Sequence, residues 1–170
     1  AFKPSRQHDS VSWDEWEDTF TTLLPIFKSV GWLKDLNRIN VGDGLITNNA
    51  VAQYFMSHKS IDLENNVDMG KWSEYVVGDT REHTLVHEII HHAHMYLNDF
   101  GQQDVSFPDA DTKVIIQHEV SYYAGSSVNE AIAEIGSGIA LGHEFPEFVH
   151  DFYEKYDGPQ GVYEIGETLR

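Results

Sequence analysis

Residues 87–91 are His87-Glu88-Ile89-Ile90-His91. Because residues four apart share one face of an α-helix, the imidazoles at 87 and 91 can reach a single metal ion. Imidazole nitrogens bind Zn²⁺ at about 2.0–2.1 Å. Ile89 and Ile90 between them suit the side of a helix that packs into a core. The pattern therefore predicts a helix that carries two zinc ligands.

Glu88 follows His87 directly, so it points beside the metal rather than at it. A carboxylate in that position can act as general base and take a proton from a zinc-activated water. With 10 His and 14 Glu in 170 residues, the H-E-x-x-H pattern arises by chance in roughly one such sequence in twenty. The surrounding sequence therefore has to support the interpretation.

The motif lies in a stretch with helical periodicity. Asp79 or Thr80 can cap the helix at its start, and Gly101 is a plausible stop. The apolar residues recur on one face, at Leu85, Val86, Ile89, Ile90, Ala93 and Leu97. Such an amphipathic helix packs one side into a core and can present His87 and His91 together.

A catalytic zinc normally has three protein ligands and one open position. A second helix, predicted from Val128 to about Leu141, carries Glu130 and Glu134 on one face that otherwise consists of Ala, Ile and Gly. Carboxylates on such a face are costly to bury unless they are paired or bind metal. One could ligate zinc, and the other could accept the N–H of a ligand imidazole. Asp99, eight residues after His91, is the rival third ligand.

HEIIH on one helix, followed by Asn129-Glu130-Ala131-Ile132-Ala133-Glu134 on a later one, resembles the gluzincins. These are the thermolysin-like and clostridial-neurotoxin-like zinc peptidases, and the resemblance covers about residues 60–136. It implies that Glu130 is the third ligand and that Glu134 supports a ligand histidine. HEIIHHAH also resembles, more weakly, short bacterial effector peptidases that enter host cells.

This resemblance implies an α+β, zincin-like fold in which the HEIIH helix packs on a small twisted sheet beside the Glu130 helix. It also implies an endopeptidase with one catalytic Zn²⁺ and a peptide or protein substrate. A Tyr or His donor would steady the oxyanion of the tetrahedral intermediate. Tyr123 or Tyr122, just before the Glu130 helix, is favoured over His143 just after it, with Tyr123 taken as the catalytic candidate, and either tyrosine could instead belong to the core. The strand at 60–64 is expected to bind extended peptide at the sheet edge.

Other functions fit the same residues. The site could belong to a zinc amidase of another class, or to a metal-dependent toxin that cleaves one host protein. HEIIH could also be structural, in a non-catalytic metal-binding or interaction domain. The sequence leaves these alternatives open.

Before the metal helix, apolar residues at helical spacing predict a helix from Ser12, a possible N-cap, to about Asn37, broken or kinked at Pro25 and Gly31. Turns and short strands are expected in 38–50, a β-hairpin in 51–64 and a loop in 65–78. After the metal helix we expect the following, in chain order: a loop at 102–112, a strand or helix at 113–123, a helix at 145–156, and a turn-rich tail from 157.

The remaining histidines have less specific interpretations. His92 is expected to face solvent and His94 to line the cleft, each most simply as a bystander. His143, Glu147 and His150 also have helical spacing, which leaves a second metal site open.

Length and composition fit one domain over residues 1–170, with a loose end at 1–9. The absence of cysteine excludes disulfides and thiolate metal sites. A formal net charge of −17 makes nucleic-acid binding a poor hypothesis. No apolar run is long enough for a membrane span, and the first twenty residues contain no signal peptide. The compartment stays open, with a secreted or effector-like protein among the possibilities.

Overall fold

The structure is a computed structural model, and it describes residues 5–6, 14–46, 50–65, 70, 72–103 and 105–170. Its strands form one sheet in the order β1-β2-β4-β3. They are β1 (Ser5–Arg6), β2 (Arg38–Gly42), β3 (Ala52–Phe55) and β4 (Ser60–Glu64). The pairs β1–β2 and β2–β4 are parallel, whereas β3 and β4 form the predicted antiparallel hairpin. β1 lies in the stretch that was expected to be a loose end.

Alternation of apolar residues places one face of the sheet in the core. Ile39, Val41, Ile61 and Leu63 have no exposed surface, as the period of two along β2 and β4 requires. β4 pairs with neighbours on both sides, so the expectation that residues 60–64 form the edge strand is wrong. The edge on this side of the sheet is β3.

Helix α1 (Asp14–Ser29) covers the sheet with a stripe of buried Trp16, Phe20, Leu23 and Phe27. Pro25 lies inside this helix and does not end it. The chain leaves the helix before Gly31, whose positive φ of 82° is favourable for glycine. Ser12, the predicted N-cap, lies outside the described residues.

Helix α2 (Arg81–His91) carries the HEIIH motif and starts at the predicted place. Thr80 is its N-cap, with Oγ1 accepting from the backbone N–H of His83 at 3.2 Å. The α-helix ends at His91 and continues as a π-helical stretch over His92–Leu97, so it does not reach Gly101. Insertion of π-helical turns is frequent near functional sites.

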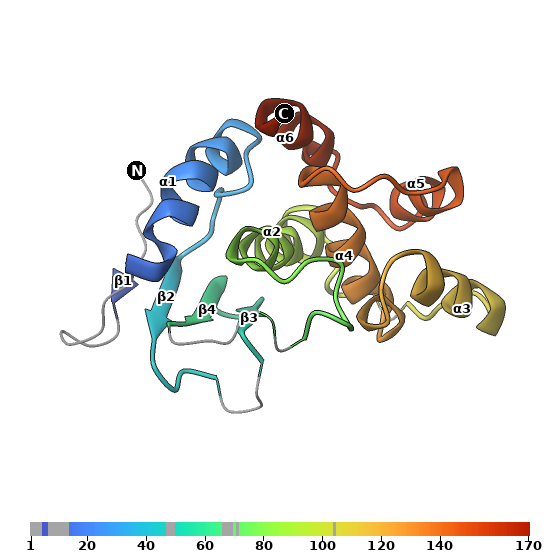
Figure 1. The fold of residues 1–170 in the computed structure, drawn as a ribbon, viewed down its shortest axis with the longest axis horizontal. Coiled ribbons are helices and arrows are strands. Elements are labelled where there is room, and N and C mark those ends of the chain that lie inside the picture. The colour runs from blue at the N-terminus through green and yellow to red at the C-terminus, as the bar shows by residue number, and fades with distance from the viewer. Residues whose placement is uncertain (1–4, 7–13, 47–49, 66–69, 71, 104) are drawn as a thin grey trace.

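Helix α4 (Val128–Ala140) packs against α2, and Figure 1 shows α2 between the sheet and α4. The small residues of α4 allow this close approach, as predicted. A Cβ built on Gly136 would lie 2.6 Å from Cδ1 of Ile90 on α2. This contact fixes the distance between the helix that carries the two histidines and the helix that carries the two glutamates.

The described residues contain three further α-helices, α3 (Ala110–Glu119), α5 (Glu147–Lys155) and α6 (Gly161–Leu169), and a short 3-10 helix, η2 (Tyr123–Gly125). α3 resolves the open choice between strand and helix, and it begins earlier than expected. The tail after residue 157 is mostly helix α6, not turns, because Val162 and Ile165 pack into the core beside α4. The protein is thus α+β. Among the described residues, no helix has the length and apolarity to cross a membrane.

Candidate metal centre and active site

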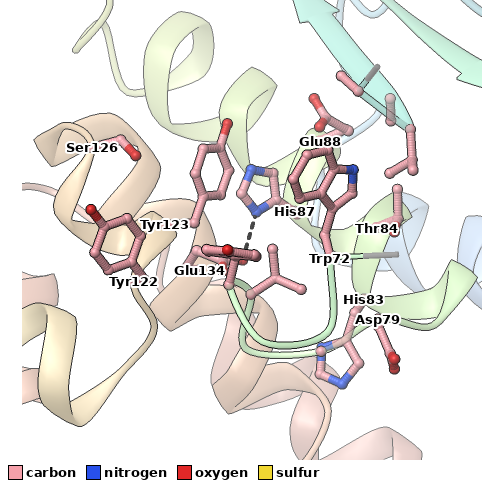
Figure 2. A pocket seen from close by; sticks show the side chains of 16 residues that line it. Trp72, Asp79, His83, Thr84, His87, Glu88, Tyr122, Tyr123, Ser126 and Glu134 are labelled. Carbon is pink, nitrogen blue, oxygen red and sulfur yellow. Dashed lines mark hydrogen bonds and ion pairs between the residues drawn. The ribbon is translucent and has the colours of Figure 1, made fainter. Parts of the chain in front are cut away.

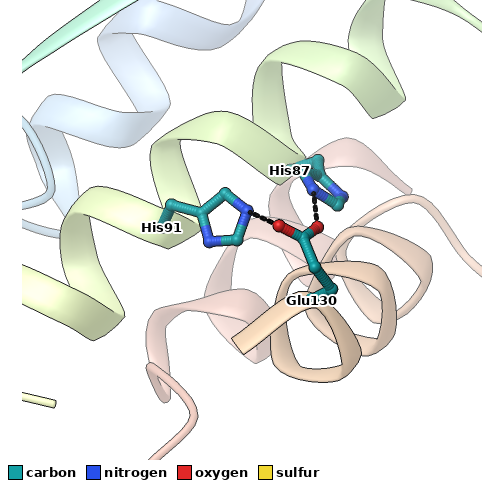
Figure 3. Close-up of side chains that lie close together, drawn as sticks. All are labelled: His87, His91 and Glu130. Atoms are coloured by element: carbon teal, nitrogen blue, oxygen red, sulfur yellow. Dashed lines mark hydrogen bonds and ion pairs between the residues drawn. The ribbon is translucent and has the colours of Figure 1, made fainter. Parts of the chain in front are cut away.

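His87, His91 and Glu130 come together between α2 and α4. Nε2 of His87 lies 3.0 Å from Oε2 of Glu130, and Nε2 of His91 lies 3.1 Å from Oε1 of the same carboxylate. Figure 3 shows this carboxylate between the two imidazoles. All three side chains offer a ligand atom within 4.8 Å of the others. Glu130 follows His87 by 43 positions and His91 by 39. Together the three residues form a group that could hold a metal ion.

The local sequence explains how Glu130 reaches this position. Ser127 caps α4, with Oγ accepting from the backbone N–H of Glu130 at 3.1 Å. Ser127 and Glu130 have the spacing of a capping box, in which the glutamate would turn back to the cap. Here the Glu130 side chain instead extends across to α2, where it contacts both histidines.

The donor set and spacing fit zinc. Two ligands bound tetrahedrally at about 2.0–2.1 Å lie about 3.3 Å apart, close to the 3.0 and 3.1 Å separations between Glu130 and the two imidazoles. Mixed imidazole and carboxylate ligands favour zinc over magnesium and calcium, which prefer all-oxygen sites. His87 and His91 are also nearly buried, at 8% and 6% exposure.

Glu134 holds the other nitrogen of His87. Its Oε2 lies 3.0 Å from Nδ1 of His87, and its Oε1 accepts from the backbone N–H of Val77 at 3.0 Å and the hydroxyl of Ser121 at 2.8 Å. The carboxylate is 2% exposed and fully engaged. It therefore fixes the His87 ring so that Nε2 faces Glu130 and His91.

The two glutamates also control protonation of the site. Burial lowers the pKa of His87, but hydrogen bonds to Glu130 and Glu134 and their charges outweigh burial and raise it well above its usual range. Burial acts to raise the pKa of Glu130, but His91 and His87 hold that pKa far below its usual range. The carboxylate of Glu130 is thus ionised and available as a ligand.

Glu88 lies beside His87 and lines a cavity of about 350 Å³. It is 8% exposed, and burial raises its pKa against the opposing effect of His87 and His91. A buried carboxyl with a raised pKa suits proton transfer in both directions. Figure 2 shows His87 and Glu88 side by side at the cavity.

Tyr122 and Tyr123 both line this cavity but differ in their contacts. The Tyr123 ring stacks on the His87 ring, with centroids 5.9 Å apart and planes 14° from parallel. Burial, the charge of Glu130 and a hydrogen bond to it raise the pKa of Tyr123, so the phenol keeps its proton. Tyr122 is 65% exposed and contacts Tyr75 instead. Of the two tyrosines, Tyr123 is the one that contacts His87 and Glu130.

The structure does not bring the other candidates to the site. Asp99 is exposed, with a positive φ of 56°, and does not belong to the ligand group. His143, Glu147 and His150 form no metal-ligand group in the part of the chain that the structure describes.

His92 and His94 are fully buried, so the expectation that His92 faces solvent is wrong. His92 bonds the Tyr54 hydroxyl and the Lys34 carbonyl, and His94 bonds the Tyr156 carbonyl. His94 is not among the residues that line the cavity. Through these hydrogen bonds, the π-helical stretch contacts β3, the loop after α1 and the C-terminal end of α5.

Several residues of the site were not predicted. Ser121 and the backbone of Val77 complete the surroundings of Glu134, and Trp72, Tyr75 and Asp79 line the cavity. They come from irregular segments that have no periodicity. The contact of Val77 is made by its backbone N–H, which the identity of the side chain does not reveal. Only the tertiary fold reveals them.

No protein-family model matches the chain, and no curated protein matches it. Among solved structures, it is similar to the crystal structure of a Bacteroides caccae protein whose assignment as a zinc-binding metallo-peptidase is unverified. The two are 13% identical with a TM-score of 0.46, over 99% of this chain and 76% of the other. Similarity this low establishes no relationship, so the interpretation of the site depends on its own geometry.

Proposed function

We propose that this chain is a zinc-dependent endopeptidase of the gluzincin type. One observation carries the proposal: the Glu130 carboxylate lies 3.0 and 3.1 Å from the two imidazoles of HEIIH. The second glutamate of the same helix occupies the remaining nitrogen of His87. His87, His91 and Glu130 would be the zinc ligands, and Glu134 would orient His87.

Each remaining side chain has a role in this proposal. Zinc bound at the three ligands would supply a Lewis acid that activates water and polarises the substrate carbonyl. Glu88 accepts the proton of the attacking water on its carboxylate and later delivers it to the leaving amine. The hydroxyl of Tyr123 donates a hydrogen bond to the carbonyl oxygen as negative charge develops there.

The edge strand β3 offers a place for an extended peptide. The backbone N–H of Glu64 donates to the carbonyl of Val51. Because hydrogen-bonded and non-hydrogen-bonded pairs alternate, the backbone groups of Ala52 and Tyr54 point away from β4. Val51 and Ala52 also line the cavity beside Glu88. A peptide added along β3 would thus pass the candidate catalytic residues.

The test is Glu88→Gln, compared with the wild type on a denatured protein substrate, with zinc content measured on both. We expect wild-type cleavage that chelation abolishes, and a fall of at least about a thousandfold in the variant with zinc retained. Glu119→Gln, an exposed change on α3, is the matched control and should cleave normally.

The other outcomes separate the alternatives. Equal cleavage by wild type and Glu88→Gln would remove Glu88 from the mechanism and overturn the proposal. If the zinc-loaded wild type cleaves small amides but no peptide, the site belongs to an amidase of another class. If it cleaves neither, the binding-domain interpretation is the better one.

A further inference from the structure

The cavity beside Glu88 extends well beyond the catalytic residues. In Figure 2, His87 lies between Tyr122 and Tyr123 on one side and Asp79 and His83, which line the far end, on the other. Arg81, the first residue of α2, precedes His87 by six residues, which corresponds to about 9 Å along the helix axis, and Asp79 lies before the N-cap Thr80. A short side chain bound next to the scissile bond would leave the far end empty. The cavity therefore suits a long side chain.

Aromatic rings form much of its wall. Trp72 and Tyr75 make an edge contact with centroids 5.9 Å apart, and Tyr75 makes a second with Tyr122, also at 5.9 Å. The backbone N–H of Tyr123 donates to the carbonyl of Tyr75 at 2.8 Å, which ties the two aromatic segments together. Trp72, Tyr75 and Tyr122 remain 37–65% exposed.

Among the described lining residues, the charged side chains other than the histidines are all acidic. Asp79, Glu88 and Glu134 line the cavity, and none of its described lining residues is Lys or Arg. With Glu130 behind them, four carboxylates outweigh the two charges of a zinc ion. His83 adds no positive charge, since burial and His143 lower its pKa. The cavity is thus a negative, aromatic-walled space.

Asp79 is the acidic residue that the proposed mechanism does not use. Glu134 is engaged by His87, Val77 and Ser121, and Glu88 serves as the base. Asp79 is not the cap of α2, because Thr80 has that role. Asp79 lines the cavity beside His83, on which its charge acts.

We propose that this cavity binds a lysine or arginine side chain of the substrate, adjacent to the bond that is cleaved. The identification of the ligand as a peptide and its position next to the cleaved bond rest on the proposed function. The methylene stem packs between the rings, and the cation lies against the aromatic faces of Trp72 and Tyr75. Asp79 attracts the charge at the far end. An uncharged side chain gains only the packing, and an acidic one is repelled.

The test uses three sets of alanine-based peptides in which one position, varied along the peptide, is lysine, norleucine or glutamate. Norleucine keeps the lysine stem without the charge. Binding is measured by calorimetry on zinc-loaded Glu88→Gln, and cleavage is measured on the wild type. At one position we expect lysine to bind roughly tenfold more tightly than norleucine, and glutamate more weakly than both.

Asp79→Asn, added to Glu88→Gln, identifies the residue responsible. We expect it to reduce the lysine preference over norleucine several-fold while norleucine binding is unchanged. Asp151→Asn, an exposed change of equal charge on α5, should leave the preference intact. If norleucine binds as well as lysine at every position, or if Asp79→Asn leaves the preference unchanged, the proposal is wrong.

The two measurements separate this proposal from the proposed function. Lysine-selective binding without cleavage would support the cation-binding cavity and overturn the proposed peptidase activity. Cleavage without any lysine preference would support the peptidase activity and overturn the cation-binding cavity.

Discussion

Nδ1 of His87 lies 3.0 Å from Oε2 of Glu134, at the ring nitrogen that does not face Glu130. The same glutamate also accepts from Val77 and Ser121 through Oε1, so its carboxylate cannot rotate freely. His91 has no equivalent: its Nδ1 is buried and lacks a hydrogen-bond partner among the described residues. The orientation of the site therefore depends mainly on the pair His87 and Glu134.

Glu134→Gln is expected to weaken zinc binding by about 10–100-fold. The amide oxygen can still accept from Val77 and Ser121, which leaves an NH₂ group facing the N–H of His87. Two donors then meet, and the ring loses its fixed orientation. Competition with a chromophoric chelator measures the affinity.

Glu134→Gln needs a check that the variant still folds, because this α4 side chain is buried against the loops that contain Val77 and Ser121. Unchanged far-ultraviolet circular dichroism, together with weakened zinc binding, would assign the effect to the hydrogen bond. Wild-type affinity in a folded variant would contradict the role assigned to Glu134.

Glu130→Gln is expected to lose most of the bound zinc, because a neutral amide replaces the anionic ligand between the two imidazoles. Asp99→Asn is the matched test of the rival ligand and should keep about one zinc per chain. Elemental analysis of the purified proteins measures both. Zinc retained by Glu130→Gln and lost by Asp99→Asn would reverse the assignment.

The ligand helices were predictable because their signals are local. The apolar face of α2, its start at Asp79 or Thr80, and the small residues of α4 all follow from spacing and side-chain size. Glu130 and Glu134 were recognisable as candidate site residues, since two carboxylates on a face of Ala, Ile and Gly are costly to bury without partners. The hairpin of β3 and β4 followed from two β-prone runs around a polar turn.

The errors concern features that only tertiary contacts determine. Strand order is not encoded in a hairpin, so whether β3 or β4 forms the edge depended on where β2 docks. Helix α6 is short, and Gly161 and Gly166 lower its intrinsic helix propensity. Its packing against α4 stabilises the helix despite this low propensity. His92 looked solvent-exposed because its partners, Tyr54 and the Lys34 carbonyl, lie 38 and 58 residues away.

Tyr123→Phe is expected to lower kcat by a factor of roughly 10–1,000 with zinc retained, because it removes one hydroxyl donor and keeps the ring stacked on His87. Tyr122→Phe is the neighbouring control and should stay near the wild-type kcat. Steady-state kinetics on one cleavable peptide, with zinc content measured in parallel, provides the comparison. Equal rates for Tyr123→Phe and wild type would exclude this hydroxyl from the mechanism.

The thermal stabilisation by zinc is expected to increase with pH. In the metal-free protein, Glu130 and Glu134 raise the pKa of His87. Protonated His87 then contributes stability that is fully present below its unfolded pKa of about 6.5 and is lost as pH rises through the raised folded value. Zinc competes with that proton, so its affinity increases over the same range.

Calorimetric Tm values with zinc and with chelator, from about pH 6 to about pH 8.5, measure this difference. The difference should widen with pH, because the metal-free protein loses the His87 contribution while the zinc-loaded protein keeps its ligands. In Glu134→Gln the pKa of His87 loses one of its two raising partners, so the widening should stop at a lower pH than in the wild type. A difference that stays constant over the whole range in the wild type would mean that His87 is not the group that exchanges a proton for zinc.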